Sequence, residues 1–188
     1  MILSGDFQLG LSSGTSNWWG KEIIMTPEQE YKKLFERMAN LCEQQGWGDP
    51  FSYARSKEIY AAASLGHQVA AEYSGADAYH KDETPVEYKS TIGNKCKGTY
   101  TGISVQPTWE EQEKYLRDKK IAAYPKHYYS RFDAGHLAEC WTMSGKKVLE
   151  LLLPKLKRKY LTVLSKKDPR LSAVITWGEI KKYGTRVI

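Results

Sequence analysis

The sequence has few cysteines, and they form no recognisable pattern. Cys42, Cys96 and Cys140 are the three among 188 residues, and no two of them make a CxxC pair. An odd and scattered set of thiols predicts neither a disulfide framework nor a structural zinc site. We therefore expect a reducing compartment, which for this chain means the cytoplasm.

Long apolar runs are also missing. The stretch "VLELLLPKL" is the most apolar part of the chain, and it is interrupted by Glu150 and Pro154. A helix needs about 20 predominantly apolar residues to cross a bilayer. The N-terminus has no basic region followed by an apolar stretch, so no signal peptide is predicted. We expect a soluble intracellular protein with no membrane partner.

Two common functional motifs are absent as well. The four histidines show neither HxH nor HExxH spacing, which argues against a zinc enzyme. The segment "GTSNWWGKE" has five residues between its glycines where a phosphate-binding loop has four, and Glu22 follows Lys21 in place of Ser or Thr. The sequence therefore favours neither zinc chemistry nor a nucleoside triphosphatase.

Basic and aromatic residues, by contrast, are plentiful. The chain has a formal net charge of +6, with 13 tyrosines and 6 tryptophans. A positive balance favours a polyanionic partner such as double-stranded DNA. The tail contains three basic clusters, "KLKRKY", "SKKDPR" and "EIKKYG". One such cluster is typical of a solvated helix face, but three together favour a surface that neutralises phosphates.

The apolar patterns and turn residues predict a mixed α/β fold. The expected elements are helices at 27–45 and 51–64, extended segments at 67–79, 85–91 and 98–105, and a helix at 109–120. They continue with a hairpin at 127–143, whose turn is Asp133-Ala134-Gly135, and a helix at 145–160 that is bent or ended near Pro154. Thr26 and Thr108 are suitable N-caps for two of the helices. This order predicts a central mixed β-sheet flanked by helices within a single domain.

One short pattern has a spacing that suits catalysis. The triplet Glu-x-Lys occurs three times, at Glu30–Lys32, Glu87–Lys89 and Glu179–Lys181. The first lies in a predicted helix, where residues two apart point to different faces, and the third lies in the basic tail. Only the second lies in a predicted strand, where positions two apart share a face. The segment "DETP" can reverse the chain between Asp77 and Glu87, so a hairpin can bring these two carboxylates and Lys89 together.

The residue types at this hairpin suit a hard cation. Two carboxylates without His or Cys partners favour Mg²⁺, for which Mn²⁺ is a substitute, and such an ion can activate water for attack on a phosphate. Lys89 beside them could orient that water or stabilise negative charge. The alternative is a surface hairpin with a cross-strand ion pair, worth about 0.5 kcal/mol.

Asp77 together with Glu87-Tyr88-Lys89 resembles the PD-(D/E)XK nuclease superfamily, which includes type II restriction endonucleases. The shared core of that superfamily runs helix, three strands, helix, strand, and this order is similar to residues 51–143 of the chain. Ala76 stands where the motif has Pro. The resemblance implies a restriction-endonuclease-like core that hydrolyses DNA phosphodiester bonds with Mg²⁺, between an N-terminal arm at 1–25 and a C-terminal helix and basic tail at 144–188.

The resemblance adds a further candidate ligand. Several members carry an acidic residue on the helix before the first strand, and Glu58 is the only acidic residue of the predicted helix at 51–64. Its metal role and an ordinary exposed charge stay open as alternatives. Gln106 is a weaker candidate for a contact with water or phosphate. His80, three residues after Asp77, is expected to be a solvated turn residue, and His67 a structural one.

Two classes of function follow from these residues. The first is an Mg²⁺-dependent DNA endonuclease of the type II restriction kind, with Asp77, Glu87 and Glu58 as metal ligands and Lys89 as a catalytic residue. Cutting both strands of a palindrome predicts a homodimer. A repair or junction nuclease would use the same site. The second class is a basic nucleic-acid-binding protein without catalysis, whose carboxylates only form surface ion pairs.

Overall fold

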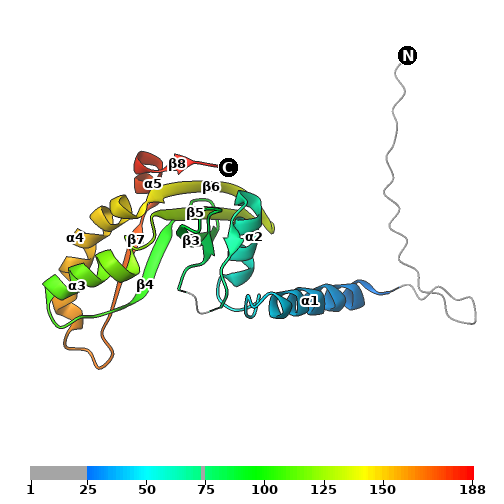
Figure 1. Ribbon diagram of the computed structural model, residues 1–188, viewed down its shortest axis with the longest axis horizontal. Coiled ribbons are helices and arrows are strands. Elements are labelled where there is room, and N and C mark those ends of the chain that lie inside the picture. Colours follow the sequence, from blue (N-terminus) through cyan, green and yellow to red (C-terminus); the bar gives the residue numbers. More distant parts are fainter. Residues whose placement is uncertain (1–24, 73–74) are drawn as a thin grey trace, which may run out of the picture. The chain divides into compact units, whose positions relative to one another are not determined.

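The computed structural model describes residues 25–72 and 75–188 (Figure 1). The chain divides into two compact units, one up to Leu41 and the other from Cys42 onward. The predicted N-terminal arm, with Trp18 and Trp19, lies outside the described residues except for Met25. Within the described residues, no helix has both the length and the apolar character that crossing a bilayer requires.

Helix α1 spans Pro27–Gln44, as the sequence predicts. Thr26 Oγ1 accepts a hydrogen bond from the Gln29 backbone at 3.3 Å, and Gln29 Oε1 accepts one from the Thr26 backbone at 2.9 Å. This reciprocal pair satisfies two backbone N–H groups at the start of the helix. The helix ends before Gly46, whose φ of 66° suits a residue without a side chain.

The second unit is built on a mixed six-stranded sheet, so the predicted α/β class is confirmed. The strands are, in sheet order, β1 (Gln68–Val69), β2 (Ala78–Tyr79), β3 (Pro85–Ile92), β5 (Lys126–Asp133), β6 (His136–Ser144) and β8 (Thr185–Arg186). Strands β3 and β5 run parallel, and the other neighbours are antiparallel. Strands β4 (Gly98–Ser104) and β7 (Arg170–Ile175) form a separate antiparallel pair.

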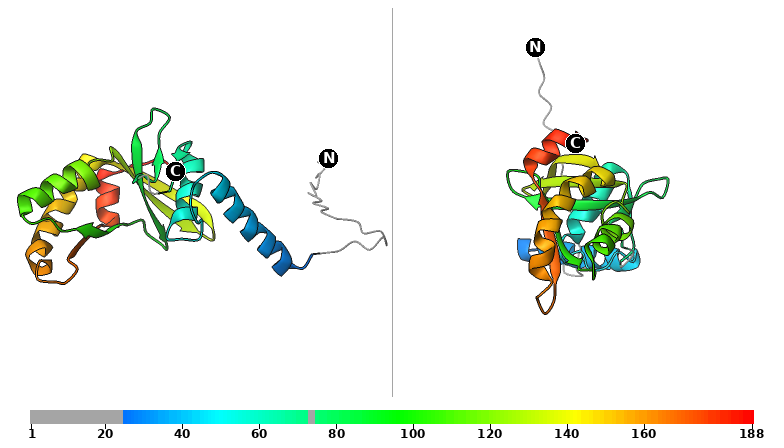
Figure 2. Two further views of the ribbon diagram at one scale, coloured as in Figure 1. Left: turned by 60° about the horizontal axis from the view of Figure 1, so that its bottom comes forward. Right: turned by 90° about the vertical axis from the view of Figure 1, so that its left-hand side faces the viewer.

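The helices of this unit pack against its strands through two apolar cores. They are α2 (Arg55–Leu65), α3 (Trp109–Tyr115) with a following π-helical turn η1 (Leu116–Lys120), α4 (Gly145–Val163) and α5 (Trp177–Tyr183). Figures 1 and 2 show α3 and α4 side by side, with β7 running along α4. One apolar core joins α4 and β7 to the sheet, and a smaller core joins α2 to the sheet through Ala61 and Ala62.

The register of β3 against β5 decides which side chains share a face. Glu87 is paired with His127, and Lys89 with Tyr129, while Tyr88 between them is paired with Tyr128. Because side chains alternate along a strand, the first two pairs lie on one face and the third on the other. Tyr88 and Tyr128 belong to the core beneath α2, whereas Tyr129 belongs to the core beneath α4.

The structure corrects four expectations about the elements. The extended segment at 67–79 is not one strand, because it splits into β1 and β2, which pair antiparallel. Strand β4 lies outside the main sheet. The turn of the β5–β6 hairpin has two residues, Ala134 and Gly135, because Asp133 pairs with His136. Beyond α4 the basic tail forms β7, α5 and β8.

Pro154 predicts a bend or an end in the helix at 145–160, but helix α4 does not end there. Pro154 lies inside it, and the helix continues to Val163. Its buried residues recur along the helix on both sides of the proline, and Leu152 and Leu156 are fully buried. Because Pro disrupts an isolated helix, packing against β7 and the sheet is what keeps α4 continuous.

Candidate active site

The predicted reversal between Asp77 and Glu87 is confirmed. Strands β2 and β3 pair antiparallel with Ala78 opposite Val86. In the connecting turn Asp82 Oδ1 accepts a hydrogen bond from the Thr84 backbone at 3.1 Å. A side chain that bonds the backbone two residues on is a common way to stabilise a turn. The register, extended by one position, puts Asp77 opposite Glu87.

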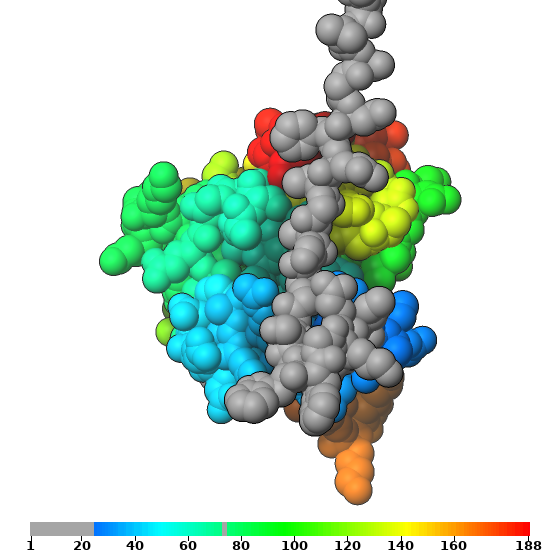
Figure 3. Space-filling model, turned by 90° about the vertical axis from the view of Figure 1, so that its right-hand side faces the viewer, coloured from blue at the N-terminus to red at the C-terminus, as the bar shows by residue number. Residues whose placement is uncertain are grey.

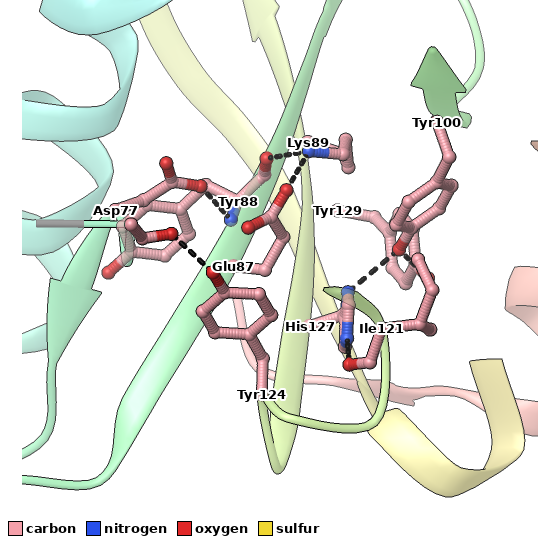
Figure 4. Close-up of polar contacts among 10 residues, drawn as sticks. Asp77, Glu87, Tyr88, Lys89, Tyr100, Ile121, Tyr124, His127 and Tyr129 are labelled. Atoms are coloured by element: carbon pink, nitrogen blue, oxygen red, sulfur yellow. Dashed lines mark hydrogen bonds and ion pairs between the residues drawn. The ribbon is translucent and has the colours of Figure 1, made fainter. Parts of the chain in front are cut away.

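Asp77 is fixed through both its backbone and its side chain. Its N–H donates to the Val86 carbonyl, and its carbonyl accepts from the Ala70 N–H, each at 3.2 Å. Its carboxylate Oδ2 accepts a hydrogen bond from the Tyr88 backbone N–H at 2.6 Å (Figure 4). The amide between Glu87 and Lys89 therefore orients the first carboxylate of the site.

Glu87 and Lys89 project from the same face of β3 and pair directly. The Lys89 ammonium donates to Glu87 Oε1 and also to the Tyr88 carbonyl at 3.1 Å. The Lys89 and Glu87 side chains are only 20% and 17% exposed, so this is not a solvated surface pair. The ammonium also lies 5.2 Å from the centre of the Tyr100 ring, at a cation–π distance.

Glu58 reaches the same region from α2. It lies in the first turn of that helix and forms an ion pair with Arg55 at 3.3 Å. Glu58 and Asp77 line one cavity of about 340 Å³. The structure thus brings all four predicted site residues, Asp77, Glu87, Lys89 and Glu58, into one neighbourhood.

The crowding of these charges shifts two pKa values. Burial and then the neighbouring carboxylates of Glu87 and Glu58 together raise the pKa of Asp77 from 3.8 to about 7, against the opposing effect of Lys89. Burial by itself lowers the pKa of Lys89, but the carboxylates of Glu87 and Asp77 outweigh it and raise that pKa above its ordinary value. The lysine therefore stays charged, while Asp77 is a carboxylate that ionises only at a cost.

The donor set fits a hard cation bound in part by other ligands. Within the described residues, no three His, Cys, Asp or Glu side chains converge as a ready-made metal cage. Mg²⁺ does not require one, because it is commonly held by one or two carboxylates together with waters and substrate phosphates. Asp77, with its raised pKa, and Glu87 beside it are oxygen donors whose mutual repulsion a bound cation would relieve.

A buried hydroxyl network lies on the same face, and the sequence did not reveal it. Tyr100 Oη lies 2.8 Å from His127 Nδ1 and 3.0 Å from Tyr129 Oη, and His127 Nε2 lies 2.9 Å from the Ile121 carbonyl (Figure 4). Burial lowers the pKa of His127 to about 4, so the imidazole is neutral. Since a carbonyl only accepts, Nε2 donates to Ile121, and Tyr100 therefore donates to Nδ1.

Tyr124 is a second neighbour of the site that sequence reasoning missed. Its hydroxyl donates to the Gly75 carbonyl, two residues before Asp77. Burial and the carboxylates of Glu87 and Asp77 raise the pKa of Tyr124 to about 12. The hydroxyl is therefore protonated at neutral pH, and it ties the loop before β5 to the segment that carries Asp77.

The weaker candidates lie elsewhere. The Gln106 backbone bonds with Gln112 and Tyr160 in the loop between β4 and α3. His80 is not a solvated turn residue, because its Nε2 lies 3.2 Å from Tyr128 Oη and its ring centre lies 4.3 Å from that of His67. This aromatic cluster is on the face opposite Glu87.

Comparisons with known proteins add nothing to these observations. No family model matches the chain, and no curated protein matches it.

Proposed function

We propose that the protein is an Mg²⁺-dependent DNA endonuclease that hydrolyses phosphodiester bonds, of the type II restriction kind. The observation that carries this proposal is the convergence of Asp77, directly before β2, with Glu87 and Lys89 of the adjacent strand β3. The Asp77 carboxylate accepts a hydrogen bond from the Tyr88 backbone, and the largely buried Glu87 and Lys89 form an ion pair. The pKa of the Asp77 carboxylate is raised to about 7, which is not expected of a carboxylate in an ion pair between exposed side chains.

The order of elements gives further support to the resemblance to PD-(D/E)XK nucleases. Helix α2, strands β1 to β3, helix α3 and strand β5 occur in this order, with β4 inserted between β3 and α3 and with β5 parallel to β3. Asp77 directly precedes the second of these strands, and Glu87 and Lys89 lie on the third. A β4–β7 pair is added beside this core.

Each residue has a role that follows from its surroundings. Asp77 and Glu87, with Glu58 close by, would hold Mg²⁺ or Mn²⁺. When bound, such an ion makes hydroxide accessible near neutral pH and offsets charge on the phosphate. Lys89 carries a positive charge at a fixed point, where it can donate a hydrogen bond to the attacking water or to a phosphate oxygen. The Tyr88 N–H holds the Asp77 carboxylate in one orientation.

The basic surface of α4 and the following turn suits double-stranded DNA as the substrate. Lys155 and Lys159 are engaged, through Glu179 and the Ser172 carbonyl respectively. Other exposed basic side chains of this stretch are Lys146, Arg158, Lys166 and Lys167, and Lys157 is exposed with its ammonium 5.5 Å from the centre of the Trp109 ring. If the enzyme cuts both strands of a palindrome, two copies related by a two-fold axis would act together.

Incubation with supercoiled plasmid tests the proposal. Cleavage in Mg²⁺ and none in EDTA is expected, with discrete fragments for a site-specific enzyme. Smearing would favour a non-specific nuclease, and cutting only of branched or damaged DNA a repair or junction enzyme. Intact DNA of every kind in Mg²⁺ and in Mn²⁺ would favour the non-catalytic binding protein, for which Glu87–Lys89 and Glu58–Arg55 are structural ion pairs.

A further inference from the structure

The cavity beside Asp77 is larger than a hydrated ion requires. Its volume of about 340 Å³ lies at the lower end of the range for sites that bind small organic molecules, roughly 300–1,000 Å³. Its walls come from the loop before α2, the first turn of α2, and residues 71–72 and 75–77. Figure 3 shows α2 and the preceding loop on one face of the molecule.

The charged groups that line this cavity are mainly carboxylates, which accept hydrogen bonds. The only cation among its lining residues is Arg55, and its guanidinium is already engaged: Nε donates to the Trp47 carbonyl at 2.6 Å, Nη2 to the Ala70 carbonyl at 2.5 Å, and Nη1 pairs with Glu58. Four carboxylates line the walls, those of Asp49, Glu58, Glu72 and Asp77. Without a bound cation a phosphate would be repelled here, whereas a neutral ligand with N–H donors would be favoured.

Two of these carboxylates belong to the cavity alone. Asp49 Oδ1 accepts from the Phe51 backbone at 2.9 Å, which leaves Oδ2 for a ligand. The Glu72 side chain packs so closely on Gly48 that a Cβ at that position would lie 2.6 Å from Glu72 Cδ. Gly48 has a φ of 75°, so no other residue would allow this approach without strain. Because Gly48 has no side chain, the carboxylate of Glu72 can lie against the loop at this position.

Aromatic side chains complete the cavity. Trp47 is half-buried in one wall, and Tyr53 at the edge is fully exposed. Tyr53 has a φ of 49°, a left-handed conformation that costs a non-glycine residue energy. A tyrosine that is held in this conformation and buries none of its ring against the protein offers a flat surface for stacking.

We infer that this cavity binds an unpaired nucleobase that carries an exocyclic amino group, next to the phosphate to be cut. Stacking on Tyr53 and Trp47 would hold the ring, and Asp49 and Glu72 would accept hydrogen bonds from the two N–H bonds of the amino group. The inference rests on the proposed function, because the shared Asp77 makes the bound base a neighbour of the reacting phosphate. On a duplex substrate the base would have to leave the stack, so a duplex that already carries an unpaired base should bind more tightly than an uninterrupted one.

Binding without cleavage tests the inference separately from catalysis. In EDTA, fluorescence anisotropy compares a fully paired duplex with the same duplex carrying one bulged deoxycytidine or one bulged thymidine. The bulged deoxycytidine duplex should bind about tenfold more tightly than the paired one. The affinity for the thymidine duplex should lie between the other two affinities, since thymine can stack but has no amino group.

Variants assign the preference to the cavity. Tyr53→Ala should remove most of the tenfold preference, and Tyr53→Phe should retain it because the ring is kept. Asp49→Ala with Glu72→Ala, which removes both acceptors, should bring the deoxycytidine and thymidine duplexes to equal affinity. Tyr31→Ala, which removes another exposed tyrosine, is the matched control and should behave as wild type.

Each outcome decides one of the two claims. Equal affinity of the wild-type protein for bulged and paired DNA, or a full preference in Tyr53→Ala, overturns the nucleobase site, even if plasmid is cut in Mg²⁺. A bulge preference that depends on Tyr53, in a protein that cuts no DNA, leaves the nucleobase site standing and removes the nuclease.

Discussion

The backbone N–H of Tyr88 donates to the carboxylate of Asp77 at 2.6 Å, across the pair of strands β2 and β3. This bond links the two halves of the candidate site, because Tyr88 stands between Glu87 and Lys89. Because this donor is a backbone N–H of the sheet, its position is fixed. It therefore holds the Asp77 carboxylate, whose pKa is raised, in one orientation.

Replacing Asp77 by Asn should stabilise the protein when divalent cations are absent. The pKa of Asp77 is about 7 in the folded protein and 3.8 ordinarily, so the folded state binds the proton more tightly. Stability from this group is therefore present below pH 3.8 and is lost as the pH rises through 7, by up to about 4 kcal/mol. In urea unfolding at pH 8 in EDTA, the free energy of unfolding of Asp77→Asn should be higher than that of the wild-type protein. The control Asp168→Asn, at an exposed site, should have the wild-type value.

The same variant should lose its response to Mg²⁺. A ligand that binds only the folded protein raises the unfolding temperature, so Mg²⁺ should stabilise the wild-type protein. The unfolding temperature of Asp77→Asn, which lacks the negative charge, should rise little when Mg²⁺ is added. An equal rise in both proteins would mean that Mg²⁺ binds elsewhere.

His127 should make the protein sensitive to acid. Its pKa is about 4 in the fold and 6.5 ordinarily, so the unfolded chain takes up the proton first. The stability that depends on neutral His127 is complete above pH 6.5 and is lost as the pH falls toward 4, by up to about 3 kcal/mol. His127→Gln should be less stable at pH 7 and should change less between pH 6.5 and 4. His136→Gln, at an exposed position, should follow the wild-type curve.

The pKa of His67 is also lowered to about 4, by burial and by the nearby His80. Wild type will therefore lose stability to acid through both histidines. The difference between the curves of wild type and His127→Gln isolates the part due to His127. Parallel curves would contradict the assignment of a buried neutral imidazole.

Tyr100 should support the site through its ring and the fold through its hydroxyl. Tyr100→Phe leaves His127 Nδ1 and the Tyr129 hydroxyl without their partner, a cost of about 1–3 kcal/mol in urea unfolding. It keeps the ring beneath Lys89, so the rate of DNA cleavage should stay within a few-fold of wild type. Tyr100→Leu removes the ring as well and should slow cleavage about tenfold. Equal cleavage rates of the two variants would exclude a role for the ring.

The grouping of Asp77, Glu87 and Lys89 could be predicted because it depends on local rules. A strand has a side-chain period of two, and the segment from Asp82 to Pro85 contains strong turn residues, so the hairpin and its shared face follow from the sequence. The ion pair between Arg55 and Glu58 could also have been found, since residues three apart on a helix are neighbours.

The buried network could not be predicted, because it depends on pairing over long distances. His127 shares a face with Glu87 only through the parallel register of β3 and β5, which are joined by more than 30 residues. The pattern of β4 predicts a strand but no partner, and its pairing with β7 brings Tyr100 into the core. Neither His127 nor Tyr100 lies in a motif that could have singled it out.

The rate of plasmid cleavage by Lys89→Ala, at DNA concentrations that saturate binding, tests the central claim most directly. Removing a fixed cation from the reacting phosphate should lower the rate by about 100-fold or more, while the affinity for DNA in EDTA stays unchanged. Lys89→Gln is the check that a buried polar replacement still folds, and Lys32→Ala, from the exposed Glu-x-Lys triplet of α1, should cut as wild type does. Cleavage by Lys89→Ala at the wild-type rate would contradict the account.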